Sequence, residues 1–207
     1  AEINAAVDAE RVIAIACDIG YQEPLQNSVD VTRSRLGPID TLIANAGVNP
    51  FYGPMSEIPD EAFDKTMNSN LRSNHWLCQM VAPDMLAPQR GSIMITASVG
   101  AFGPSETLGT YNISKMADIA LVRNLAMEWG PQGVRVNALC PGLIRTDFAK
   151  ALWDNPEAAK RVTEQTPLRR FGEAEDFKGI AVFAASDASA YVTGQALTVC
   201  GGTHMFR

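Results

Sequence analysis

The sequence has few of the features that mark membrane-spanning, secreted or metal-binding proteins. None of its apolar runs approaches the roughly 18 residues that a membrane span needs. The opening residues, AEINAAVDAERV, have neither the basic start nor the apolar stretch of a signal peptide. The two histidines, His75 and His204, are too few and too far apart to suggest a metal site. We therefore expect a cytoplasmic protein with no metal and no membrane partner.

Positive charge and paired cysteines are also scarce. The formal net charge of −6 argues against nucleic acid or an anionic membrane as a partner. The four cysteines lie about 60 residues apart, a spacing that matches no zinc or thiol-exchange motif. We expect buried, free thiols in a reducing compartment. They are Cys17, Cys78, Cys140 and Cys200.

Short apolar runs alternate along the chain with longer helical patterns. The runs suit strands buried on both faces of a parallel sheet; they are Arg11–Cys17, Asp40–Gly47, Gly91–Ser98, Gly133–Cys140 and Gln195–Gly202. The helical patterns are Glu23–Leu36, Asp60–Leu86, Gly109–Trp129 and Glu173–Ser186. This alternation predicts an α/β fold with a doubly wound, Rossmann-like parallel sheet. Because no linker, repeat or low-complexity segment interrupts it, we expect a single domain over residues 1–207.

A tyrosine and a lysine begin the third helical pattern. Tyr111 and Lys115 are four residues apart, so they share one face of the helix, with Cβ atoms roughly 6 Å apart. A tyrosine with an ordinary pKa near 10 is a poor base at neutral pH, and a nearby lysine cation stabilises the phenolate and lowers that pKa. The pair therefore suits a proton transfer to or from an oxygen.

Other polar and small residues stand where predicted strands end. Asn45, Ala46 and Gly47 end one strand, Ser98 ends the next, and Pro141–Gly142 and Thr146 follow a third. Ligands of doubly wound sheets bind beyond the carboxyl ends of the strands. We find no nucleophile with a histidine base beside it, which argues against acyl transfer. The set suits a reaction that moves a proton at an alcohol oxygen while another group moves a hydride.

These motifs, in this order and spacing, resemble the short-chain dehydrogenases/reductases. The resemblance rests on YNISK (Tyr111–Lys115) with Ser98 before it, on NAG (Asn45–Gly47), on Asn70 in MNSNLRSN, and on PGLIRT (Pro141–Thr146). It covers nearly the whole chain. It implies an NAD- or NADP-dependent oxidoreductase that interconverts an alcohol and a ketone or aldehyde, acting on a small molecule.

The resemblance also implies roles for individual residues. Tyr111 would be the catalytic acid/base, Lys115 would lower its pKa and hold the nicotinamide ribose, and Ser98 would orient the substrate carbonyl. Asn70 would anchor a water in the proton relay, although Asn68 and Asn74 stand close enough in sequence to take that place. The remaining cofactor contacts would come from Asp18, Ile19, Asn45, Ala46, Gly47, Pro141, Gly142, Ile144 and Thr146.

One part of the family pattern is missing from this sequence. The family begins with a strand, a glycine-rich turn (TGxxxGxG) and a helix that receives the pyrophosphate. Here Ala1–Val7 is similar to the end of a later family helix, which leads into what would be the third strand. We expect roughly 40–60 residues, about one strand–helix–strand unit, to precede this chain in the natural protein. The residue that separates NAD from NADP enzymes would lie in that unit, so the preference cannot be read.

Three further expectations concern the alternative function, the assembly and a lid. The fold could instead serve a non-catalytic protein that senses the cofactor or acts as a scaffold. By resemblance, the long helices pair with their copies across one two-fold axis and Tyr191–Gly202 lies near a second, which gives a homotetramer. The helices carry more apolar residues than one sheet face needs: Trp76, Leu77, Met80, Val81, Ile119, Leu125, Met127 and Trp129. Finally, Thr146–Phe171 is either a structural excursion or a mobile lid, and we favour a lid that covers substrate with Phe148, Leu152 and Trp153.

Overall fold

A four-stranded parallel sheet forms the centre of the molecule. The computed structural model describes residues 11–205, and within that range it describes all side chains except those of Ala151 and Leu152. Consecutive strands are neighbours in the order β1-β2-β3-β4. They are β1 Thr41–Ala44, β2 Gly91–Thr96, β3 Val134–Pro141 and β4 Ala196–Val199. β1, β2 and β4 lie inside predicted runs, and β3 extends one residue beyond its run, which confirms the parallel doubly wound sheet.

The middle strands are buried on both faces, as their largely apolar sequences predict. Ile93 and Ile95 of β2 and Val136 and Ala138 of β3 are fully buried. The register pairs Gly91 with Val134 and continues without a break along β2. All four strands therefore end at one edge of the sheet, and the loops that follow them meet there.

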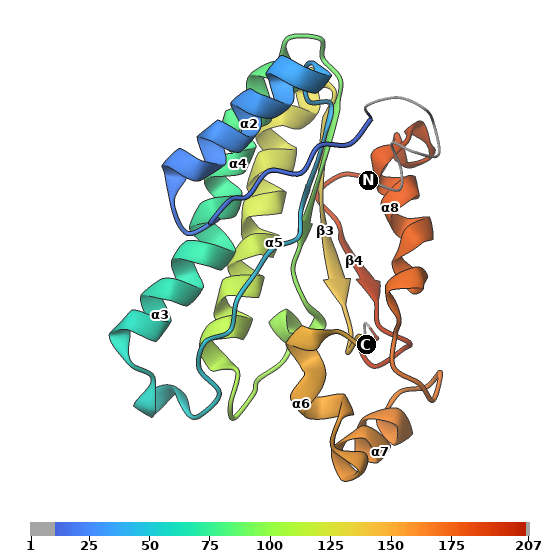
Figure 1. Cartoon of the computed structure of the whole chain (residues 1–207). Coiled ribbons are helices and arrows are strands. Elements are labelled where there is room, and N and C mark those ends of the chain that lie inside the picture. The colour runs from blue at the N-terminus through green and yellow to red at the C-terminus, as the bar shows by residue number, and fades with distance from the viewer. Residues whose placement is uncertain (1–10, 206–207) are drawn as a thin grey trace.

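Helices cover both faces of this sheet (Figure 1). On one face lie α2 Gln22–Leu36, α3 Asp60–Met67, α4 Ser73–Leu86 and α5 Gly109–Trp129; on the other lies α8 Lys178–Ala185. The bounds of α5 are those that its sequence pattern predicts. One turn of 3₁₀ helix, Ala174–Phe177, precedes α8, so the predicted helix Glu173–Ser186 is divided in two.

The predicted first strand is not a strand. Arg11–Asp18 runs as irregular backbone, and the described part of the sheet begins at β1. A strand exists when a neighbour exchanges backbone hydrogen bonds with it. Within the described residues no strand lies beside Arg11–Cys17, which explains the difference. The predicted helix end at Ala1–Val7 falls outside the described residues.

The long helix predicted over Asp60–Leu86 is interrupted. One turn of π-helix, Asn68–Arg72, joins α3 to α4. Such a turn inserts an extra residue into the helical hydrogen-bond pattern, and π-turns occur frequently at functional sites. Here the turn contains Asn70, one of the predicted site residues.

The segment after β3 leaves the sheet and returns to it. It contains α6 Lys150–Trp153 and α7 Pro156–Gln165, which lie beyond the carboxyl ends of β3 and β4 (Figure 1). Its two ends are fastened by a parallel bridge between Ile144 and Gly172, with Arg145 donating its N–H to the Gly172 carbonyl at 2.9 Å. Residues 145–171 therefore form an excursion with a closed base.

Half of the apolar residues that we assigned to subunit contacts serve the core of this chain. Val81, Ile119, Leu125 and Trp129 are buried against the sheet and its neighbouring helices. The excess of apolar residues on the long helices is thus smaller than the sequence suggested, because α4 and α5 pack against each other as well as against the sheet. Met127 remains 81% exposed.

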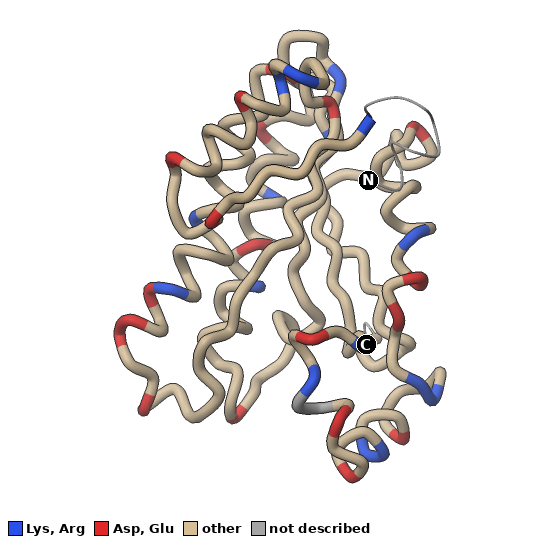
Figure 2. The backbone as a smooth tube through the Cα atoms, in the orientation of Figure 1, with Lys and Arg blue, Asp and Glu red and all other residues tan. Residues whose placement is uncertain are grey.

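Charged residues lie mainly on the outer helices and loops, with both signs interspersed, while the strands carry few (Figure 2). All four cysteines are free thiols. Cys78 and Cys140 are buried, whereas Cys17 and Cys200 are half-buried, so complete burial holds for two of the four. Within residues 11–205, none of the helices is both long and apolar enough to cross a membrane.

Candidate active site

The ends of three strands bring the predicted site residues together. Asn45 follows β1, Ser98 stands two residues after β2, and Gly142 follows β3. The helix α5 begins after the loop that leaves β2, so its first turn faces the same edge of the sheet. The Asn45 side chain is tied to the next strand, because the Thr96 hydroxyl donates to its Oδ1 at 3.1 Å.

Ser98 and Tyr111 are in direct contact. Extended backbone at Ser98 ends the strand, and its Oγ accepts the N–H of Gly100 at 3.0 Å, which caps a short 3₁₀ turn. The Ser98 side chain also hydrogen-bonds the Tyr111 hydroxyl. Burial raises the pKa of Tyr111 above its usual value, the Ser98 hydrogen bond opposes that rise, and the negative charge of Asp118 adds to it.

Lys115 lies one helical turn from Tyr111 and is buried. Its Nζ is 5.9 Å from the centroid of the Tyr111 ring, so the two side chains share a small volume, as their spacing predicts. The ammonium donates to the Thr96 carbonyl at 2.7 Å and to Oδ2 of Asp118 at 3.2 Å. In this arrangement Lys115 is held by the sheet and by Asp118, and its lowering of the Tyr111 pKa stays a prediction.

Asn70 is fully buried and joins three elements. Its Oδ1 accepts the Val48 N–H at 2.7 Å, and its Nδ2 donates to the Val48 carbonyl at 3.0 Å. The same Nδ2 donates to Ser114 Oγ at 3.0 Å. The side chain therefore fixes the loop after β1 against α5. Of the two other asparagines considered from the sequence, Asn68 begins the same π-turn and Asn74 lies one turn further along.

Gly47 lets this loop approach the lysine closely. A Cβ at this position would lie 3.3 Å from Asn70 Oδ1 and 3.5 Å from Lys115 Nζ. Asn45 and Ala46, just before it, are exposed. Without a side chain at Gly47, the backbone of this loop passes close to Lys115.

The other predicted cofactor contacts come from two segments, residues 18–19 and residues 141–146. Asp18 is exposed and Ile19 is half-buried, and Asp18 Oδ1 accepts the Gly20 N–H at 2.9 Å in a tight turn. At the end of β3, Pro141 and Gly142 are half-buried, and Gly142 donates its N–H to the Val199 carbonyl at 3.0 Å.

The excursion after β3 reaches over the tyrosine. The rings of Phe148 and Tyr111 have centroids 6.0 Å apart, and Phe148 is 62% exposed. Trp153 donates its indole N–H to the carbonyl of the exposed Thr146 at 2.8 Å. The structure thus brings Phe148 to the site, whereas the side chain of Leu152 falls outside the described residues.

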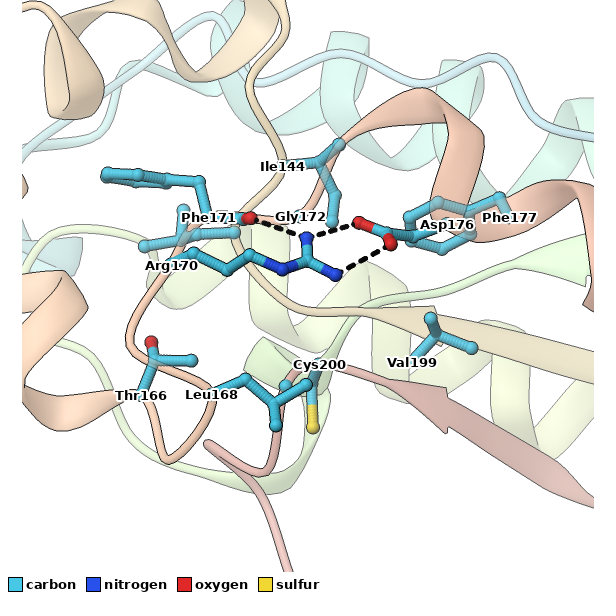
Figure 3. A pocket seen from close by; sticks show the side chains of 12 residues that line it. Ile144, Thr166, Leu168, Arg170, Phe171, Gly172, Asp176, Phe177, Val199 and Cys200 are labelled. Carbon is cyan, nitrogen blue, oxygen red and sulfur yellow. Dashed lines mark hydrogen bonds and ion pairs between the residues drawn. The ribbon is translucent and has the colours of Figure 1, made fainter.

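A cavity of roughly 180 Å³ lies between the base of the excursion and the end of β4 (Figure 3). Ile144 and Phe171 line it from the base of the excursion, and Val199 and Cys200 line it from the end of β4. Arg170 crosses it and donates to both carboxylate oxygens of Asp176, at 2.6 and 2.8 Å. Among the described residues that line it, Ser98, Tyr111 and Lys115 do not occur.

Sequence reasoning missed two features of this region. One is the buried pair of Asn74 and Asp118: Asn74 donates to Asp118, and Asp118 forms an ion pair with Lys115. Asp118 follows Lys115 by three residues and Tyr111 by seven, so its helical spacing could have indicated the shared face. The other is the Arg170–Asp176 pair, which no spacing rule singles out. Within residues 11–205, no cluster of histidine, cysteine, aspartate and glutamate has the arrangement of a metal site.

Comparison with known proteins shows extensive similarity. A family model described as "Enoyl-(Acyl carrier protein) reductase" matches residues 1–204. Dehydrogenase/reductase SDR family member 4 of Oryctolagus cuniculus is 38% identical over 200 residues, which are 96% of this chain and 77% of that protein.

Two solved structures are similar at the level of fold and sequence. Gluconate 5-dehydrogenase of Burkholderia cenocepacia J2315, in complex with NADP and tartrate, has a TM-score of 0.86 and 30% identity, with 90% of this chain and 72% of that one covered. A 7α-hydroxysteroid dehydrogenase complexed with NADH and 7-oxo glycochenodeoxycholic acid has a TM-score of 0.85 and 36% identity, with the same two coverages, 90% and 72%.

Proposed function

The chain belongs to the short-chain dehydrogenase/reductase family, and on that premise we propose that it is an NAD(P)(H)-dependent oxidoreductase that interconverts an alcohol and a ketone or aldehyde. The observation that carries the proposal is the contact of Ser98 with Tyr111, with the buried Lys115 one turn away. Three groups that can orient and protonate a carbonyl oxygen lie near one another at the carboxyl edge of the sheet, where we propose a crevice for cofactor and substrate. We propose that one domain carries both this chemistry and the cofactor site.

The residues of the crevice fit a nicotinamide dinucleotide. Gly47 leaves the space that a Cβ would fill, next to Asn70 and Lys115, and the small residues Asn45 and Ala46 precede it. We propose that Asp18, Ile19 and residues 45–47 contact the adenosine half. Lys115, Pro141, Gly142, Ile144 and Thr146 would then contact the nicotinamide half, and both NADP and NADH occupy related structures.

The chain's own residues would handle the substrate oxygen and its proton. The nicotinamide, when bound, gives or accepts the hydride. In reduction, Ser98 donates a hydrogen bond to the substrate carbonyl and Tyr111 transfers its phenolic proton to that oxygen; oxidation reverses both steps. Lys115 stabilises the phenolate left on Tyr111, and Asn70 keeps the loop after β1 in place beside it.

We further propose a homotetramer in the cytoplasm. Apolar side chains remain exposed on two separate surfaces of this chain. Met116 (41%) and Met127 (81%) lie along α5, while Val182 (68%) and Tyr191 (104%) lie on and after α8. Two distinct apolar surfaces support two different two-fold contacts, which together generate D2 symmetry.

The experiment is a paired test of binding and turnover with the full-length protein. NADH and NADPH are titrated separately, and a panel of ketones, aldehydes and alcohols is then screened by the absorbance of the reduced nicotinamide. Binding of at least one nucleotide, with turnover of at least one panel member, is the expected result. Binding without any turnover would favour a cofactor-sensing or scaffold protein, and failure to bind either nucleotide at millimolar concentration would remove the enzyme proposal.

A further inference from the structure

A buried carboxylate lies beside the lysine of the proposed site and has no part in the steps above. Asp118 is fully buried, in the middle of α5. Its two oxygens have separate partners: Oδ1 accepts from Asn74 Nδ2 at 2.9 Å, and Oδ2 accepts from Lys115 Nζ at 3.2 Å. Both partners are themselves buried, Asn74 to 2% exposure and Lys115 to 3%.

Asn74 connects this pair to the π-turn. Its Nδ2 donates a second hydrogen bond, at 2.6 Å, to the backbone carbonyl of Asn70. Asn74 thereby contacts the backbone carbonyl of Asn70 and also the Asp118 carboxylate, which is the counter-ion of Lys115. A chain of buried polar contacts runs from Asn70 through Asn74 and Asp118 to Lys115.

We propose that Asp118 is a positioning residue for the acid/base chemistry, in which its carboxylate, held by Asn74, anchors the Lys115 ammonium and counterbalances its positive charge at Tyr111. The inference rests on the proposed function of Tyr111 as the acid/base. Carboxylate and ammonium are too deeply buried for solvent to screen them, so each acts strongly on nearby groups. Removing a buried carboxylate therefore changes the charge that Tyr111 experiences by a full unit.

The groups that face Asp118 come from three elements. Lys115 and Tyr111 lie on its own helix, Cys78 faces it from α4, and Cys140 interacts with it from β3. Burial raises the pKa of Asp118 to about 6, and Lys115 and Asn74 limit that rise. Burial, with the Asp118 charge as a second cause, raises the pKa of Cys78 to about 12, so that thiol stays neutral. At neutral pH the charges of this cluster are thus one ammonium and one carboxylate.

Two consequences follow for Tyr111. The Asp118 charge raises the pKa of Tyr111, and it opposes the effect expected of Lys115. With Asp118 ionised, the phenol should release its proton at a higher pH than it would beside an unpaired lysine. Alcohol oxidation, which begins with the phenolate, should therefore depend on pH through Asp118, whereas reduction, which begins with the phenol, should depend on it less.

The test is the pH dependence of alcohol oxidation in the full-length holoenzyme, with Asp118→Asn as the central variant. An amide keeps the shape of the side chain and the acceptor for Asn74 but removes the charge. Because oxidation needs the phenolate, log kcat/KM rises with pH and levels off above the Tyr111 pKa. We expect this inflection to move down by about one pH unit in Asp118→Asn, the size typical of one nearby charge. At a pH below both inflections, kcat/KM for oxidation should then rise about tenfold relative to wild type.

Two further variants keep the result interpretable. Glu128→Gln removes a carboxylate from the exposed end of the same helix and should leave the profile unchanged. Asn74→Ala removes the anchor but keeps the carboxyl group. Because Asn74 lowers the Asp118 pKa, its loss should raise that pKa and leave less negative charge on Asp118 near neutral pH, so kcat/KM for oxidation there should rise by less than in Asp118→Asn. If Asp118→Asn does not fold, Asn74→Ala decides alone, and an unmoved profile in it overturns the inference.

A readout without turnover separates this inference from the proposed function. The absorbance of tyrosinate, taken as the difference between each protein and its Tyr111→Phe version, follows the titration of Tyr111 directly. Titration of Tyr111 at a lower pH in Asp118→Asn supports the inference even if no substrate is found. An identical titration in wild type and Asp118→Asn overturns it, even if the enzyme turns over normally.

Discussion

Replacement of Asn70 by alanine should destabilise the protein strongly, because this side chain satisfies both backbone groups of Val48. The side chain is fully buried, accepts the Val48 N–H at 2.7 Å and donates to the Val48 carbonyl at 3.0 Å. A buried polar group that loses its partner costs about 1–3 kcal/mol. Two such groups, partly relieved by movement of the loop, give a loss of about 2–4 kcal/mol. For a domain of this size that is a fall in Tm of about 4–16 °C.

Thermal unfolding followed by circular dichroism, at one protein concentration, measures this effect. Asn124→Ala is the matched control: it makes the same change on α5, where the amide donates only to the Ala120 carbonyl at an exposed position. We expect the control to lie within about 0.5 kcal/mol of wild type. If Asn70→Ala were equally neutral, the reasoning that the asparagine fixes the loop after β1 would be refuted.

Three other predictions concern the backbone, the buried acid and the excursion. Gly133→Ala should destabilise the protein by at least about 1–2 kcal/mol, because its φ is +75° and a Cβ would lie 2.1 Å from the Gln89 carbonyl oxygen. Gly130 has a φ of −55° and open space around it, so Gly130→Ala should be neutral or slightly stabilising in the same thermal melt. Burial raises the pKa of Asp118 from 3.8 to about 6, so its contribution to stability is present below about pH 4 and lost as pH rises through about 6; Tm of wild type relative to Asp118→Asn should fall across that window, and a constant difference would contradict the assignment. Hydrogen exchange of Thr146–Phe171 should slow when NAD(H) or NADP(H) is added to the full-length protein, and equally strong protection in both states would identify a rigid segment instead of a lid.

The parallel sheet and most helices could be predicted from the sequence because burial leaves a direct pattern. The largely apolar run of β2 matches its burial on both faces, and α5 begins and ends where its sequence pattern does. Arg11–Cys17 has the same kind of sequence but forms no strand, because backbone pairing depends on a neighbouring strand and not on the apolar sequence alone. The pattern also could not show the π-turn at Asn68–Arg72, where an extra residue leaves helical propensity unchanged.

Site residues could be predicted where their spacing in the sequence places them on one helical face, and they were missed where only burial in the folded protein reveals them. Tyr111 and Lys115 were found because their four-residue spacing places them on one helical face. Asp118 lies on that face too, but a charged residue in a helix ordinarily indicates a solvated surface. Its full burial results from α4, whose Asn74 covers it, and a contact between two helices has no local signature in either sequence.

The most direct test of the account is the effect of Tyr111→Phe on hydride transfer in the full-length protein. The change removes one hydroxyl and keeps the ring that packs near Phe148. We predict that turnover falls by about two to four orders of magnitude, the usual contribution of a positioned acid/base, while the Kd of the nicotinamide cofactor changes little. Tyr191→Phe, the same substitution at a fully exposed tyrosine, should retain wild-type turnover. Near-normal turnover in Tyr111→Phe would contradict the central claim that this phenol moves the proton.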